Sequence, residues 1–232
     1  MNSWNYPQWN AYFEHNSQHR LKIDFSQEPT LTKTEKALIF PSIRAFQKGE
    51  GSDGRHLLET VERFAKEIRE PAYACAMQWF VREENWHSAY LRQYMDFYSV
   101  RPLKRTLLDS IFRLLRKTGG LKGEIMVLVT AEMIALCYYD ALSRAVDSPA
   151  LRSICAQMLH DETRHIRFQS YTLSRLGLCR PHFLLRILLM EASSVFVWLA
   201  FRKVFRTGGY SFIRFLRKNM DCLRQSMNSH KG

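Results

Sequence analysis

Apolar residues recur every three or four positions along most of the chain, and few stretches alternate apolar with polar residues. This period is typical of α-helices, in which side chains three and four positions apart share one face. Residues 1–35 are polar and aromatic with little period, and they are expected to form an arm with one short helix. The pattern predicts four long helices and two that follow them, at about 41–68, 72–99, 122–146, 149–176, 181–206 and 210–226.

The lengths of the connections predict how these helices are arranged. A short turn joins the first to the second helix, and another joins the third to the fourth, which makes each pair antiparallel. A longer connector that begins at Pro102 separates the two pairs. We therefore expect an all-α, ferritin-like four-helix bundle with a crossover connection and additional C-terminal helices. The expected divisions are an N-terminal arm (1–40), the bundle (41–180) and C-terminal helices packed on it (181–232).

Each predicted bundle helix carries one glutamate on its apolar, core-facing side. A buried carboxylate without a partner is costly, and four that converge would repel one another strongly. Nearby basic residues such as Arg82 and Arg164 fall off these apolar stripes, so they do not explain the acids. Two divalent cations would neutralise four carboxylates, and neutral imidazoles would complete their coordination. The glutamates are Glu50, Glu84, Glu132 and Glu162, and His87 and His165 follow the second and fourth of them by one helical turn.

The spacing supports convergence of these residues. Glu132 and Glu162 are equally far from the break at residue 147, so an antiparallel pair places them at equal heights, about 22 Å from the turn. One Glu-x-x-His motif is weak evidence, but two of them with partner glutamates form a strong joint signal. A structural network of acids and histidines is the alternative. Glu83 is an alternative ligand to Glu84, although the motif spacing and the apolar stripe favour Glu84.

With these residues, the chain resembles the ferritin-like superfamily of di-iron carboxylate proteins over about 41–176. The stretch FQKGEGSDGRHLLETVERFA is also similar to the first-helix signature of a poorly characterised bacterial branch. The resemblance implies that Glu84 and Glu162 are the central, catalytic pair and bridge two metal ions. It implies further that Glu50 and His87 complete the coordination of one ion, and that Glu132 and His165 complete the coordination of the other.

The resemblance also assigns a role outside the ligand set. In relatives such as the small subunit of ribonucleotide reductase, an aspartate before the fourth-helix glutamate binds the second-helix histidine. This implies that Asp161 orients His87 and fixes its tautomer. The alternative is a surface acid that pairs with Arg164. Glu191, in a nearly uncharged helix, is either a further ligand or a partner of a basic residue, and Tyr138 and Tyr139 are core residues or candidate redox tyrosines.

Some features of related proteins are missing. Rubrerythrins carry a second glutamate one turn from the third-helix ligand, where this chain has Leu128, Val129 and Ala135. Arylamine N-oxygenases have an additional histidine where Met158 stands. His165 in turn distinguishes the chain from ferritin cages, which usually lack a fourth-helix histidine.

Composition indicates the cellular compartment of the protein and the kinds of partner that it could bind. The five cysteines form no Cys-x-x-Cys pair, which excludes a zinc ribbon and indicates reduced, cytoplasmic usage. No basic segment followed by an apolar run begins the chain, so we expect no signal peptide. The net charge is +12, with basic residues concentrated in 101–117 and 202–224. This charge would suit a solvated face, an acidic protein or an anionic membrane surface, and nucleic acid is the less favoured partner.

The leading hypothesis is a dioxygen-activating non-haem oxidoreductase with two Fe ions, or Mn/Fe or Mn, that acts on a small organic substrate. Hydroxylation, desaturation and N-oxidation are the candidate reactions, with an external electron donor such as a ferredoxin and a homodimeric assembly. One alternative is metal and peroxide handling, as in a ferroxidase, peroxidase or catalase. Another is a non-enzymatic basic helical binding protein. An apolar cavity beside the metals, bounded by the fifth helix, would favour the oxygenase.

Overall fold

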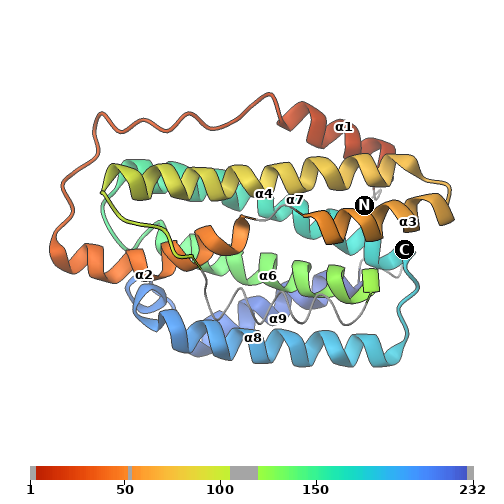
Figure 1. Ribbon diagram of the computed structural model, residues 1–232. Helices are drawn as coiled ribbons and strands as arrows, with labels where there is room; N and C mark the ends of the chain where they lie inside the picture. The colour runs from red at the N-terminus through yellow and green to blue at the C-terminus, as the bar shows by residue number, and fades with distance from the viewer. Residues whose placement is uncertain (1–3, 52–53, 105–119, 229–232) are drawn as a thin grey trace.

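Long helices run side by side along one axis of the computed structural model (Figure 1). The model describes residues 4–51, 54–104 and 120–228, and within these ranges all regular structure is helical, without a strand. The predicted connector at 101–117 lies mostly outside the described residues. The helices are α1 (Tyr6–Asn16), α2 (Lys33–Glu50), α3 (Arg55–Glu67), α4 (Pro71–Phe97), α6 (Gly120–Leu142), α7 (Pro149–Arg175), α8 (Arg180–Thr207) and α9 (Phe212–Asn228).

Two helices, α2 and α3, stand where the sequence predicts one continuous helix at 41–68, so that prediction is wrong. α2 starts at Lys33, behind a capping box formed by Thr32 and Glu35, and so begins inside the segment predicted as an arm. α2 ends at Glu50, and α3 begins after Gly54, whose φ is +61°. A Cβ atom at Gly54 would lie 2.7 Å from Cγ1 of Val81 on α4. Glycine is required there by both conformation and space, and the chain bends where the helical period alone predicts continuity.

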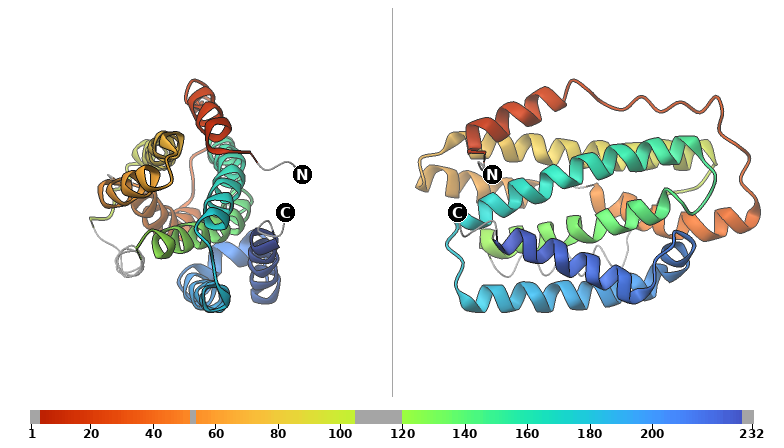
Figure 2. Two further views of the ribbon diagram at one scale, coloured as in Figure 1. Left: turned by 90° about the vertical axis from the view of Figure 1, so that its right-hand side faces the viewer. Right: turned by 180° about the vertical axis from the view of Figure 1, so that it is seen from behind.

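The bundle core is built by α4 and α7, with α2 and α3 packed on α4 and α6 packed on α7. α6 is apolar on nearly all sides and is buried along most of its length, as expected of a helix enclosed by others. α8 and α9 pack on α6 on the far side from α4, and Figure 2 shows them at one edge of the bundle. The fifth and sixth predicted helices are therefore confirmed.

The short helix expected in the N-terminal arm is α1, which lies on α4 (Figure 1). Tyr6, Trp9 and Phe13 repeat at helical spacing and are buried, so the arm contributes to the core instead of extending into solvent. The ring of Phe13 lies 6.0 Å from the ring of His165, between their centroids. α1 thus closes the bundle over one of the predicted site residues.

Candidate metal centre

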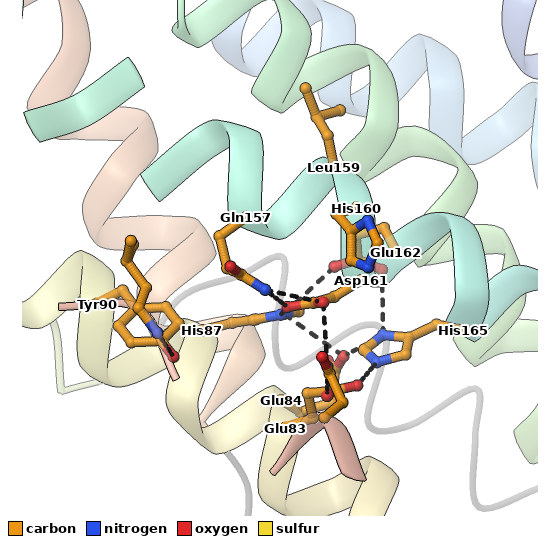
Figure 3. Close-up of polar contacts among 12 residues, drawn as sticks. Glu83, Glu84, His87, Tyr90, Gln157, Leu159, His160, Asp161, Glu162 and His165 are labelled. Carbon is orange, nitrogen blue, oxygen red and sulfur yellow. Dashed lines mark hydrogen bonds and ion pairs between the residues drawn. The ribbon is translucent and has the colours of Figure 1, made fainter. Parts of the chain in front are cut away.

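Two helices bring the two Glu-x-x-His motifs together in the middle of the bundle (Figure 3). α4 presents Glu84 and His87, and α7 presents Glu162 and His165, each pair one turn apart on one helix face. One ligand atom from each of these four residues lies within 4.8 Å of the others. The helical period therefore places an imidazole and a carboxylate from each helix at the same point.

The inner nitrogens of both histidines face carboxylates. Nδ1 of His165 lies 2.9 Å from Glu84 and 3.5 Å from Glu162, and Nδ1 of His87 lies 3.7 Å and 3.6 Å from the same two acids. These approaches lack the alignment of hydrogen bonds, and both Nδ1 atoms are buried without a hydrogen-bond partner. Oxygens of Glu84 and Glu162 are unpaired in the same way. Unpaired nitrogen and oxygen donors that share one buried point fit a divalent cation.

The outer nitrogens of the histidines are held by acids from the opposite motif. Nε2 of His87 lies 3.1 Å from Asp161, and Nε2 of His165 lies 2.8 Å from Glu83. Each of these acids directly precedes the glutamate of its own motif, so the two hydrogen bonds cross between α4 and α7. Asp161 is buried and lies against His87, so the alternative of a surface acid is wrong. Such an outer carboxylate fixes which ring nitrogen carries the proton and leaves the other free to bind a metal.

Glu83 departs from the sequence-based expectation. The apolar stripe of α4 predicts that Glu83 lies on a different face from Glu84 and His87 and points outward. In the structure, Glu83 is only 2% exposed. The side chain of Glu84 is 18% exposed. α4 is covered by α7 on one side and by α1 on another, so residues on two of its faces are buried. Glu83 is thus placed to orient His165, a role that sequence reasoning missed.

Asn16, the last residue of α1, joins the two outer acids. Its Nδ2 donates to Oε1 of Glu83 and, over 3.3 Å, to Oδ1 of Asp161. Gln157 also donates to both oxygens of Asp161, at 3.0 and 2.9 Å. The histidines, the outer acids and the arm therefore form one hydrogen-bonded unit. No sequence signal marked Asn16, because it lies in an arm without a clear period and meets these acids only through the fold.

Glu50 and Glu132 lie beside this group of four, in the wall of an adjacent cavity. Glu50, at the end of α2, accepts a hydrogen bond from Tyr139 Oη at 2.5 Å. Both carboxylate oxygens of Glu132 are buried without a hydrogen-bond partner. Burial, together with the charges of Glu84 and Glu162, raises the pKa of both Glu50 and Glu132 well above the ordinary value. Two buried acids with a raised pKa, next to two histidines whose Nδ1 atoms lack a hydrogen-bond partner, again fit a site that positive charge completes.

The electrostatics of the central four residues are strongly coupled. Burial alone would raise the pKa of Glu84, but its contacts with His165 and His87 lower it below the ordinary value. Burial alone would lower the pKa of both histidines, but the surrounding carboxylates raise it well above the ordinary value. The carboxylates around this point therefore favour positive charge there. Metal ions would compete with protons for the imidazoles, since imidazole binds metals only in its neutral form.

A cavity of about 110 Å³ opens next to the acids. Its polar wall consists of the four glutamates of the predicted ligand set. The rest of its wall is apolar and combines small side chains with larger ones such as Phe46 and Ile134. These residues come from α2, α6 and α8 and include Ala45, Gly49, Leu128, Ala131, Ala135 and Val197.

The other candidates lie away from the point where the motifs meet. Glu191 is exposed on α8 and is not part of the cluster of four. Tyr138 donates to Ser42 Oγ at 3.0 Å and stacks on Phe46, as a core tyrosine does. Tyr139 alone of the two tyrosines touches a predicted ligand, through its bond to Glu50.

The fold and the cluster together define an all-α, ferritin-like bundle with a buried group of glutamates and histidines at its centre. Three solved structures of R2-like ligand-binding oxidase variants, each with a reconstituted Mn/Fe cofactor, have the same architecture. Their TM-scores are 0.64, 0.65 and 0.62, their sequence identities are 13%, 15% and 16%, and each match covers 96% of this chain and 92–93% of the other. No protein-family model and no curated protein sequence matches the chain. The ferritin-like fold that the sequence predicts is therefore confirmed.

Proposed function

We propose that the chain is a dioxygen-activating, non-haem oxidoreductase with two resident metal ions, either two Fe or Mn/Fe. The observation that carries the proposal is the set of inward-facing, unpaired histidine nitrogens and carboxylate oxygens beside an apolar cavity. The Mn/Fe cofactor of the structurally similar oxidases supports the choice of metals. The residues that would hold the ions are Glu50, Glu84, His87, Glu132, Glu162 and His165.

The chain supplies the geometry around these ions. When bound, the metal pair would supply the electrons and Lewis acidity that dioxygen activation requires. Asp161 and Glu83 hold the imidazoles by their outer nitrogens, so that Nδ1 of each ring faces the cluster. The bond from Tyr139 holds Glu50 at the cavity wall. These contacts fix the ligands before metal binding, which lowers the cost of ordering them.

The cavity favours organic oxidation over peroxide or iron handling. Apolar side chains of α2, α6 and α8 form most of its wall, and the four glutamates complete it. A ferroxidase or catalase needs a polar path for ions or peroxide and has no use for an apolar chamber. The proposed substrate is therefore a small, largely apolar organic molecule that binds with one end next to Glu84 and Glu162.

The electron source is proposed to lie outside the chain. Within the described ranges, the four motif residues are the one group of metal-binding side chains that lie close together, so no second redox centre is found there. A reduced ferredoxin would carry negative charge to a chain whose net charge is +12. A cytoplasmic, homodimeric protein remains part of the proposal, and five free cysteines are consistent with a reducing compartment.

Metal content tests the site. The purified protein is expected to hold about two Fe or Mn per chain, measured by plasma mass spectrometry, and Glu84→Ala with Glu162→Ala should remove both. The matched control is Glu59→Ala with Glu62→Ala, which removes two exposed acids of α3. Metal near zero in the unaltered protein after reconstitution, or full retention in the site variant, would show that the cluster is a structural network.

Oxygen chemistry separates the enzymatic alternatives. With a chemical reductant, the loaded protein should consume dioxygen, and small apolar compounds should change that rate. Rapid disproportionation of hydrogen peroxide, with no effect of small apolar compounds on dioxygen consumption, would favour the hypothesis of a catalase. Loaded protein that does neither would favour a binding protein with an inactive metal site.

A further inference from the structure

α8 carries an apolar face that the rest of the chain leaves uncovered. Its most apolar 18-residue window is long and apolar enough for a membrane span, but only 28% of that window is buried, against 78% for the corresponding window of α6. Leu184, Leu188, Val195 and Leu199 are 59%, 53%, 43% and 64% exposed. Four exposed aliphatic side chains on one helix are more than the single scattered apolar residues that a folded surface normally carries.

These side chains form a single stripe. They are separated by four, seven and four residues, which keeps them on one helical face over about 22 Å. The opposite face of α8, with Met190 and Val197, is buried against the bundle. Since α8 packs on α6 and α9, lipid cannot surround it while the fold is intact, so a membrane-spanning arrangement is excluded for the folded chain.

Exposed cations lie at both ends of the stripe. Arg180 is exposed at the start of α8, and Arg202, Lys203 and Arg206 are exposed beyond a kink at Phe201. The first turns of α9 add an exposed isoleucine, Ile213 at 69%, next to exposed Arg214 and Arg217. Glu191, the single acid in the sequence of α8, is exposed and shares the face of the stripe, between Leu188 and Val195, so one carboxylate separates its two apolar halves.

From this arrangement we infer that the outer face of α8, with the start of α9, docks on the surface of an anionic lipid bilayer. Leucines would enter the boundary between headgroups and acyl chains, and the arginines and lysine at the ends would reach lipid phosphates. The apolar stripe matches the acyl chains of such a bilayer, and the clustered cations match its anionic headgroups.

A second copy of the chain fits this face less well. The stripe covers about 220 Å², from its length and the width of one helix, whereas a stable interface buries about 800 Å² per partner. Two copies would also bring together the same cations on chains of net charge +12. An anionic bilayer supplies the opposite charge, and this attraction adds to what the small apolar area contributes.

Docking would place the bilayer close to the cavity. Val197 faces the cavity from the side of α8 opposite the stripe, so the lipid surface would lie about one helix diameter, 10 Å, away. An apolar substrate dissolved in the membrane would then be concentrated beside the cavity. This consequence rests on the proposed function, but the docking itself does not.

Flotation with vesicles tests the docking on the full chain. The protein should float with vesicles of phosphatidylcholine and phosphatidylserine, bind far less to phosphatidylcholine alone, and dissociate in high salt. Arg202→Gln with Arg206→Gln should weaken binding by about 30-fold. Leu184→Gln with Leu188→Gln should weaken it by at least about tenfold. Helical circular dichroism of both variants should be unchanged, because all four side chains are exposed.

Matched controls separate this surface from general charge and apolarity. Arg63→Gln with Lys66→Gln removes two exposed cations of α3, and Phe97→Gln removes an exposed apolar ring of α4. Both should bind vesicles as the unaltered chain does. Absence of vesicle binding, equal loss in the controls, or a dimer in light scattering that Leu188→Gln dissociates would overturn the inference. The last result would assign the face to a second copy. Because no metal is needed, failure of the proposed function would leave the vesicle result unchanged.

Discussion

Oε2 of Glu83 lies 2.8 Å from Nε2 of His165, although the two residues come from different motifs on different helices. The mirror relation holds between Asp161 and His87, at 3.1 Å. Each motif thus supplies a glutamate and a histidine to the cluster and an acid that orients the histidine of the other. The two motifs act as one unit, because neither can orient its own imidazole.

Loss of one outer acid, Glu83 or Asp161, should weaken metal binding although all the metal ligands are still present. Glu83→Ala or Asp161→Ala is expected to lower metal affinity by about 10- to 100-fold, because the histidine loses the acceptor that fixes its proton on Nε2. Competition against a chelator measures this affinity. The substitution Glu83→Gln keeps an acceptor oxygen and should lose less. Unchanged affinity in both alanine variants would contradict the orienting role.

Asn16 should stabilise the fold through the same acids. In Asn16→Ala, Glu83 and Asp161 lose a shared donor in a largely buried place. We expect the free energy of unfolding to fall by about 1–3 kcal/mol, as when buried acceptors lose a partner. Urea unfolding measures the change. Glu14→Ala, an exposed position on the same helix, should change stability by less than about 0.5 kcal/mol.

A bulky residue in the cavity should separate substrate binding from metal binding. Ala131→Phe would place a ring in the 110 Å³ cavity, beside Glu132 but without replacing it. Metal content should persist, while stabilisation by small apolar ligands, about 2.7 kcal/mol at a hundred times the dissociation constant, should vanish. A thermal shift series with aliphatic alcohols is the measurement, and Ala131→Ser is the size-matched control. If the ligand effect survives in Ala131→Phe, apolar compounds bind elsewhere.

Thiol reactivity should follow burial. Cys75 and Cys179 are exposed, whereas Cys137 and Cys155 are buried. Burial raises the pKa of Cys137 to about 12 and that of Cys222 to about 11, so at pH 8 almost none of the reactive thiolate is present at either. A disulfide reagent should therefore label Cys75 and Cys179 quickly, the partly exposed Cys222 slowly, and Cys137 and Cys155 only after unfolding. Cys75→Ser with Cys179→Ser should abolish the fast phase, and a persisting fast phase would contradict this burial pattern.

The sequence by itself determined the helices and the two motifs. Helical period is a local property, so residues three apart, such as Glu84 and His87, share a face whatever the fold does around them. The short turns at Pro71 and Pro149 then set antiparallel neighbours. These features need no knowledge of packing beyond which side of each helix is apolar. Asp161 and its contact with His87, in contrast, were expected only from a family resemblance.

Only the tertiary structure decided the rest. The helix predicted at 41–68 is interrupted between Glu50 and Arg55. Gly54 is required there because Val81 on another helix occupies the space of a side chain. Glu83 points inward because α1 covers a second face of α4, and a single apolar stripe cannot reveal two buried faces. Asn16 and the cavity likewise depend on contacts between residues far apart in the chain. A periodic pattern shows which residues face inward, but what each of them meets there is set by the packing of whole helices.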